Sequence, residues 1–88
     1  MYKVVKYITF QEGGLKQILV FPETVKHSKF RYMNPETAGF IKFKVKLIDG
    51  FNEVSCECHG RSDSLGVKSN PVEDSKLAAY HFNMVYAG

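Results

Sequence analysis

The sequence predicts an α+β protein: a single antiparallel β-sheet of four to five strands with two helices, in the order β-β-α-β-β-(β)-α. Two pairs of segments read as strands: 2–10, which is rich in β-branched and aromatic residues, with 15–21, and 40–48 with 51–58, in which apolar and polar residues alternate. A short glycine-containing turn joins each pair, and prolines open two helix-like segments. One antiparallel sheet with both helices on a single face satisfies this order best.

The composition indicates a small folded protein. We expect one domain over residues 1–88, because 88 residues are too few for two and 44% of them are hydrophobic. The net charge of +3 is well short of the concentrated charge of a dedicated nucleic-acid binder. No apolar stretch has the length of a signal peptide or a membrane span, so we expect a cytoplasmic protein that does not contact a membrane.

The first two strands are predicted to form a hairpin. Tyr2–Phe10 and Leu15–Phe21 flank the sequence Glu12-Gly13-Gly14, and either Glu12-Gly13 or Gly13-Gly14 can be the loop, which leaves the register open. Residues 18–21 are apolar on both faces, which favours an interior strand covered on both sides.

A short helix is expected from about Pro22 to Tyr32, with Pro22 at the first helical position. Its apolar stripe is weak, and Asn34-Pro35 ends it because a residue before proline avoids helical geometry. This segment is the most basic of the chain, and its candidate nucleic-acid-binding residues are Lys26, Lys29 and Arg31.

The central hairpin is the most clearly specified element. A two-residue Asp49-Gly50 loop pairs Lys46 with Glu53 and Phe43 with Cys56, so that apolar residues share one face and opposite charges meet on the other. Downstream, Leu65–Val67 is a candidate short fifth strand.

The second helix is predicted from Pro71 to about Tyr86, with Asn70 as its N-cap and Glu73 completing a near capping box. Its apolar arc is wider than packing on one sheet face requires. The stripe is Leu77, Tyr80 and Met84, which Ala78, Phe82 and Val85 extend around the helix. One interpretation is that Phe82, Val85 and Tyr86 are covered by a second subunit in a homodimer or by another protein. The alternative is that the first hairpin and the first helix of the same chain wrap around this arc.

Candidate chemistry is sparse. Cys56 and Cys58 share one strand face and are expected to be buried thiols, while His59 points away and completes no metal site. Arg61, Ser62 and Ser64 lie in a glycine-flanked loop that could hold an anion or contact a partner. No arrangement typical of catalysis is present, so we expect no catalytic residues, no metal and no cofactor.

Four short motifs resemble a group of small uncharacterised proteins of tailed bacteriophages and prophages. They are FP-x2-V-x-HS from Phe21, AGF from Ala38, C-x-GRS-x-SLG from Cys58 and S-x-P-x-ED-x2-L from Ser69. The resemblance implies that the protein is located in the cytoplasm of an infected bacterium, and it implies no activity. It also implies a shared role for a set of residues, which are His27, Ser28, Gly60, Arg61, Ser62, Ser64, Glu73 and Asp74.

The sequence thus favours a non-enzymatic phage or prophage accessory protein that acts through protein–protein interaction, for which inhibition of a host enzyme or defence system would be a fitting role. The alternative is a nucleic-acid-binding module that uses the basic segment 26–31.

Overall fold

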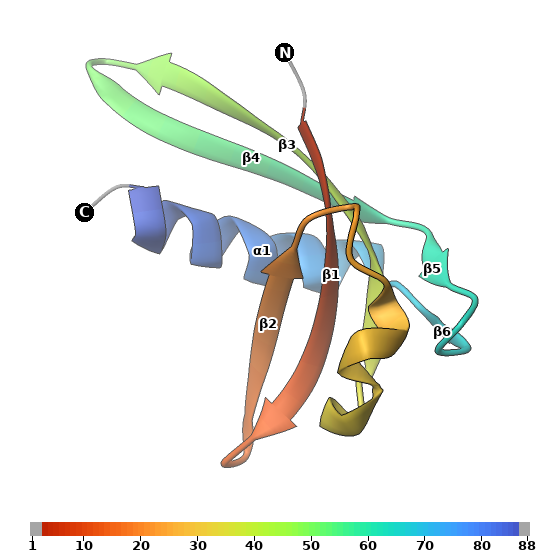
Figure 1. Ribbon diagram of the computed structural model, residues 1–88. Helices are drawn as coiled ribbons and strands as arrows, with labels where there is room; N and C mark the ends of the chain where they lie inside the picture. The colour runs from red at the N-terminus through yellow and green to blue at the C-terminus, as the bar shows by residue number, and fades with distance from the viewer. Residues whose placement is uncertain (1–2, 87–88) are drawn as a thin grey trace.

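The structure, a computed structural model, describes residues 3–86, with the side chains of Val85 and Tyr86 excepted. Its main feature is a curled antiparallel sheet in the order β2-β1-β3-β4 (Figure 1). The strands are β1 (Lys3–Glu12), β2 (Leu15–Phe21), β3 (Thr37–Ile48) and β4 (Phe51–His59). The α+β class and the antiparallel sheet are as predicted.

Both faces of this sheet are covered, by different elements. Tyr7 and Ile8 are consecutive in β1 and fully buried, and they belong to two separate hydrophobic clusters. Helix α1 (Pro71–Tyr86) packs against the Tyr7 face, whereas the 3-10 helix η1 (His27–Met33) packs against the Ile8 face. The prediction that both helices share one face is wrong, because the chain crosses from one face to the other between β4 and α1.

The crossing contains a second, two-stranded sheet made by β5 (Arg61–Ser62) and β6 (Val67–Lys68). Leu65 and Val67 pack into the cluster on the Ile8 face. The candidate fifth strand therefore exists only in part, and it pairs with β5 instead of joining the main sheet.

The first hairpin uses Gly13-Gly14 as its loop, which settles the open register. Both glycines have positive φ, 59° and 79°, and Glu12 pairs with Leu15 across the loop. β2 is an edge strand, so the expectation of an interior strand is wrong in that respect. Its two-sided apolar pattern does reflect covered faces, since Ile18 packs against one cluster and Leu19 against the other.

The first helix begins later than predicted and has 3-10 geometry. Lys26 is still extended, with φ −76° and ψ 138°, so Pro22 lies in a turn and opens no helix. His27, Phe30 and Met33 follow a three-residue period and turn toward the sheet, which suits a 3-10 helix. The predicted end is confirmed, because Asn34 adopts a left-handed conformation directly before the proline.

The central hairpin is confirmed in every predicted pair, including Lys46 with Glu53 and Phe43 with Cys56. Among the described residues, β1 pairs with β3 only as far as Lys3 with Phe43. Residues 44–48 and 51–55 consequently continue as a two-stranded ribbon, which we call the arm, beyond the rest of the sheet (Figure 1).

Helix α1 has the predicted bounds but buries a different stripe. Asp74, Ala78 and Phe82 face the core, whereas Tyr80 and Met84 from the predicted stripe are exposed. The cap also differs in detail: the Asn70 N–H donates to Asp74 and the Asn70 side-chain amide donates to Glu73, each across the first turn.

Polar side chains of α1 cover the edge of β4. The Ser75 hydroxyl accepts a hydrogen bond from the Cys58 N–H at 2.8 Å, and the Asn83 amide oxygen accepts one from the Val54 N–H at 3.1 Å. The Asn83 amide also donates to the carbonyl oxygen of Val54. Four residues of a helix and two residues of a strand cover nearly the same distance, about 6 Å. Side chains along one stripe of a helix can therefore form hydrogen bonds with backbone groups at regular intervals along the edge of a neighbouring strand.

Candidate binding surfaces

The most buried polar cluster links β1 to the start of α1. The Tyr7 hydroxyl donates to Asp74 Oδ2 at 2.5 Å, and the Asn70 N–H donates to the same oxygen at 2.8 Å. Lys16 Nζ lies 3.8 Å from Asp74 Oδ1 and 2.9 Å from a Glu73 oxygen. Burial and the bond to Asp74 raise the pKa of Tyr7, so its hydroxyl keeps its proton and serves as a donor that ties the helix to the sheet.

The two cysteines behave as the sequence predicts. Cys58 is buried, Cys56 is half-buried, and both carry free thiols. Burial raises the pKa of Cys58 to about 12 and that of Cys56 to about 11, which suppresses the reactive thiolate in both. These residues fill the core.

The loop between β4 and β6 brings two predicted site residues together. The Ser62 and Ser64 hydroxyls lie 3.3 Å apart, and buried Ser62 also accepts from the Leu65 N–H, which stabilises the turn. Arg61 turns away from them and pairs with Asp63 at 2.9 Å. The loop is tied to η1 by Arg31, whose guanidinium donates to the carbonyl oxygen of Ser64.

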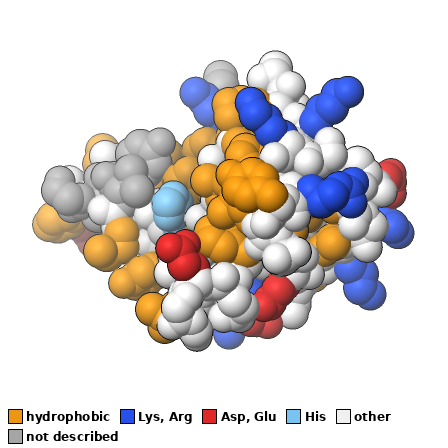
Figure 2. All heavy atoms as spheres, turned by 60° about the horizontal axis from the view of Figure 1, so that its bottom comes forward, with side chains coloured by type: hydrophobic (Ala, Val, Ile, Leu, Met, Phe, Trp, Pro, Cys, Tyr) orange, Lys and Arg blue, Asp and Glu red, His pale blue; other side chains and the backbone are white. Residues whose placement is uncertain are grey.

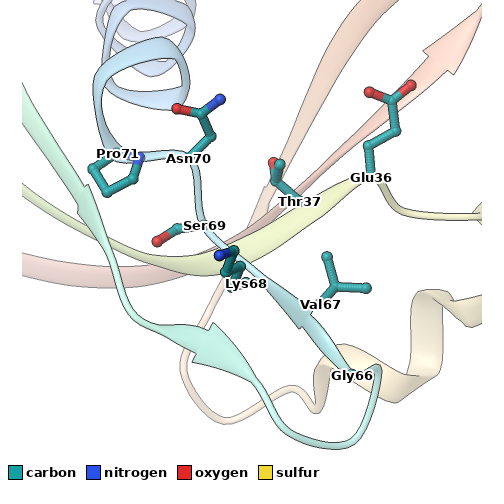
Figure 3. Close-up of a pocket in the computed structure, with 8 residues that line it drawn as sticks. All are labelled: Glu36, Thr37, Gly66, Val67, Lys68, Ser69, Asn70 and Pro71. Atoms are coloured by element: carbon teal, nitrogen blue, oxygen red, sulfur yellow. The ribbon is translucent and has the colours of Figure 1, made fainter.

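An open hollow of about 600 Å³ lies beside this loop, where β6 leads into α1 (Figure 3). Glu36 and Thr37 line one side, and the chain from Gly66 to Pro71 lines the other. The backbone at the adjacent helix start is already bonded to Asp74, as described above. The hollow is thus a shallow polar depression next to an occupied helix cap.

The basic segment of η1 presents its charges to solvent. Lys26, Lys29 and Arg31 are all exposed, and the neighbouring Tyr32 side chain is among the most exposed large side chains described. Glu23 and Glu36, also exposed, flank the segment in the sequence. The arrangement is a small cationic surface with one aromatic ring.

A groove of about 490 Å³ runs between β2 and α1. Its apolar lining comes from Leu15 and Ile18 on the strand and from Leu77, Tyr80 and Met84 on the helix. Tyr80 and Met84 are 66% and 64% exposed, so much of this lining is open to solvent. Figure 2 shows hydrophobic side chains at the centre of one face and at its lower left, while most Lys and Arg side chains lie along its upper and right margins.

The arm carries the second exposed apolar surface. Leu47 is 74% and Phe51 77% exposed, and Val45 and Ile48 are about half exposed beside them. Ile48 and Phe51 pair directly across the Asp49-Gly50 turn. The end of the arm therefore exposes apolar side chains on a two-stranded ribbon that projects from the sheet.

The predicted outer arc of α1 needs correction. Phe82 is buried and stacks on Phe43 with ring centroids 4.9 Å apart, which places it in the core instead of on a surface open to a partner. The side chains of Val85 and Tyr86 lie outside the described residues. The helix does keep a spare apolar surface, but at Tyr80 and Met84.

Sequence reasoning did not select Leu47, Tyr80 or Met84 as surface residues. Leu47 continues the apolar alternation that begins at the buried Ile41, and its place beyond the end of β1 leaves it exposed. The sequence does contain one indication of the exposed helix residues. The apolar arc of α1 is wider than the sheet can cover, so one side of this arc must remain exposed.

Within residues 3–86, no three His, Cys, Asp or Glu side chains gather where they could hold a metal ion. No helix in the same range combines the length and apolar character needed to cross a membrane. Comparisons of the chain with protein-family models, curated proteins and solved structures found no match.

Proposed function

We propose that this protein is a small, non-enzymatic accessory protein that binds another protein through the end of its arm. The observation that carries the proposal is the exposure of Leu47 and Phe51 on a projecting two-stranded ribbon. Leu47 and Phe51 lie on opposite faces of the ribbon, since Leu47 pairs with Asn52 and Phe51 with the next residue, Ile48, so the end of the arm exposes large apolar side chains on both faces. Exposed apolar surface beyond scattered single residues marks an interaction site. A two-stranded ribbon is only marginally stable alone, so a partner that covers it would also order it.

The buried polar side chains support a structural role and not a catalytic one, because their hydrogen bonds stabilise the fold. Tyr7 and Asp74 bond each other inside the core, and Ser62 stabilises its own turn. The resemblance to small phage and prophage proteins supports a role in the cytoplasm of an infected bacterium, where the partner would be a host enzyme or defence protein.

The test replaces Leu47 and Phe51 with serine and compares capture from a nuclease-treated bacterial lysate by quantitative mass spectrometry. Replacing solvent-exposed residues should change the free energy of unfolding by only about 0.5 kcal/mol each. We expect at least one protein captured by the wild type to be lost with the double variant. Tyr32→Ser is the matched control, because Tyr32 is equally exposed but lies on η1. Identical capture by all three proteins would contradict the proposal.

The second candidate is nucleic-acid binding by Lys26, Lys29 and Arg31. The exposed Tyr32 ring favours it, since a base can stack on an aromatic side chain next to cationic groups. Fluorescence anisotropy with labelled single-stranded DNA and RNA at low salt is the test. Binding should weaken steeply as salt increases and should fall when Lys26 and Lys29 become glutamine. An absence of binding at low salt would remove this candidate.

A further inference from the structure

The edge of β2 that faces away from β1 presents open backbone groups. The two-residue loop makes Glu12 and Leu15 a hydrogen-bonded pair, and bonded pairs then alternate along the hairpin. The N–H and C=O groups of Lys16, Ile18 and Val20 consequently point outward. Among the residues that the structure describes, no strand or side chain bonds these outward groups.

The two edges of the sheet are treated differently. Along β4, the side chains of Ser75 and Asn83 occupy the edge groups of Cys58 and Val54. β2 has no proline within its bounds, and its one charged residue, Lys16, is drawn toward Glu73 and Asp74 on α1. Natural proteins usually protect or pair an edge that, like this one, has no proline or cover and whose one charged side chain is directed toward the helix.

The groove beside this edge offers apolar surface on the same side. Ile18 lines it together with Leu77, Tyr80 and Met84 of α1. An added strand would bond to the open edge, and whatever accompanies that strand would cover the exposed helix side chains. A molecule that binds here must therefore supply a β-strand that pairs with β2 and apolar groups that contact the exposed side chains of α1.

We propose that the occupant is a second copy of this chain, paired antiparallel through β2 about a two-fold axis at Ile18. The two four-stranded sheets would join into one of eight strands. In this register Lys16 lies opposite Val20 of the second copy and Gln17 lies opposite Leu19, so no like charges meet. A two-fold axis perpendicular to the sheet places both α1 helices on one face, where Tyr80 and Met84 from each copy meet over the joint.

The size of the surface sets the expected strength. Seven strand residues span about 24 Å, and the strand and helix layers lie about 10 Å apart. Because each of the two layers is itself about 10 Å thick, the contact face is roughly 24 Å long and roughly 20 Å high. Its area is therefore roughly 500 Å² on each copy, or about 1,000 Å² in total, which is at the lower limit for a specific interface. We therefore expect a dimer that forms reversibly in the micromolar range and not an obligate one.

The dimer is independent of the proposed function but changes how the arm would act. β2 and β4, which forms one half of the arm, are the two edge strands of the sheet, so pairing through β2 would leave each copy of the dimer with an arm of its own. Such a dimer could engage two copies of a partner at once, with the gain that bivalency gives. Arm substitutions leave β2 untouched, so the two proposals can fail separately.

Sedimentation velocity of the full chain over the micromolar range is the first test. The mass should rise with concentration from 10.0 kDa toward twice that value. Tyr80→Glu with Met84→Glu should weaken association by at least about 30-fold, because it buries charges in the centre of the interface. Val72→Glu is the matched control: Val72 is 70% exposed on the same helix but does not line the groove.

Residue-resolved hydrogen exchange decides whether β2 forms the joint. The Gln17 and Leu19 amides bond β1 and should be protected at every concentration, which also checks that each variant is folded. The Ile18 and Val20 amides should become protected only at high concentration, and not in the Tyr80→Glu, Met84→Glu variant. A mass that stays at 10.0 kDa overturns the proposal, as does a dimer in which Ile18 and Val20 exchange freely.

Discussion

At the scale of single residues, His27 has the most informative environment. It is buried at the start of η1, its Nε2–H donates to the Gly39 carbonyl oxygen at 2.9 Å, and its ring packs edge-on against Phe21 and Phe40. Burial lowers the pKa of His27, and the nearby positive charge of Lys6 lowers it further. The folded state thus holds this imidazole neutral.

This environment predicts a pH-dependent stability. The unfolded chain protonates its histidines near pH 6.5, about their ordinary pKa, before the folded chain protonates His27. The stabilisation is therefore complete above about pH 6.5 and is lost as the pH falls toward the lowered pKa of the folded state. Urea unfolding followed by tyrosine fluorescence should show a decrease in the free energy of unfolding of at most about 1.4 kcal/mol per pH unit.

His27→Gln is the control, because its amide can also donate to Gly39 but does not titrate. This variant should be less stable than the wild type at neutral pH and should show little change from pH 7 to about pH 5.5. An unchanged slope in His27→Gln would assign the pH dependence to other groups.

At the scale of elements, the sequence predicts best where several local signals agree. The central hairpin has alternation, an Asp-Gly turn and facing charges, and every predicted pair forms. α1 starts at Pro71 as its cap residues indicate. η1 was misplaced because Pro22 resembles a helix start, while the packing of Phe30 and Met33 that fixes a 3-10 geometry depends on distant residues.

The binding surfaces were harder to predict than the elements. A strand's apolar pattern reports which of its faces are covered and not how many neighbouring strands it has, so the pattern of β2 predicts an interior strand. Strand order alone makes it an edge. Similarly, the width of the α1 apolar arc showed that one side is spare, but the choice between Phe82 and Tyr80 depends on how the helix is rotated on the sheet.

The contact between α1 and the β4 edge gives a prediction at this scale. Asn83→Ala removes an acceptor and a donor for Val54 and should lower the free energy of unfolding by about 1–2 kcal/mol. Asn83→Leu has a similar volume and should not restore the loss. Lys76→Ala, at an exposed site on the same helix, should change stability by less than about 0.5 kcal/mol. Chemical denaturation measures all three, and an Asn83→Leu variant as stable as the wild type would show that packing alone holds the helix there.

At the scale of the whole molecule, two layers of different construction enclose the sheet. A long helix covers one face and one edge, while a 3-10 helix and a two-stranded sheet cover the other face (Figure 1). Gly39 lies where these parts converge: a Cβ on Gly39 would approach the carbonyl oxygen of His59 to 2.4 Å. A glycine at this site allows β3 and the end of β4 to pass close enough for the chain to cross between faces.

The side-chain cover on β4 has a consequence for how many chains can associate. A sheet with two open edges can add molecules at both sides without limit, as in amyloid fibres. Here the groups of Val54 and Cys58 are already bonded to α1, so strand addition along this stretch would first have to displace the Asn83 and Ser75 side chains. Growth of the sheet along this stretch of β4 therefore carries an extra cost, which works against edge-to-edge polymerisation of the chain.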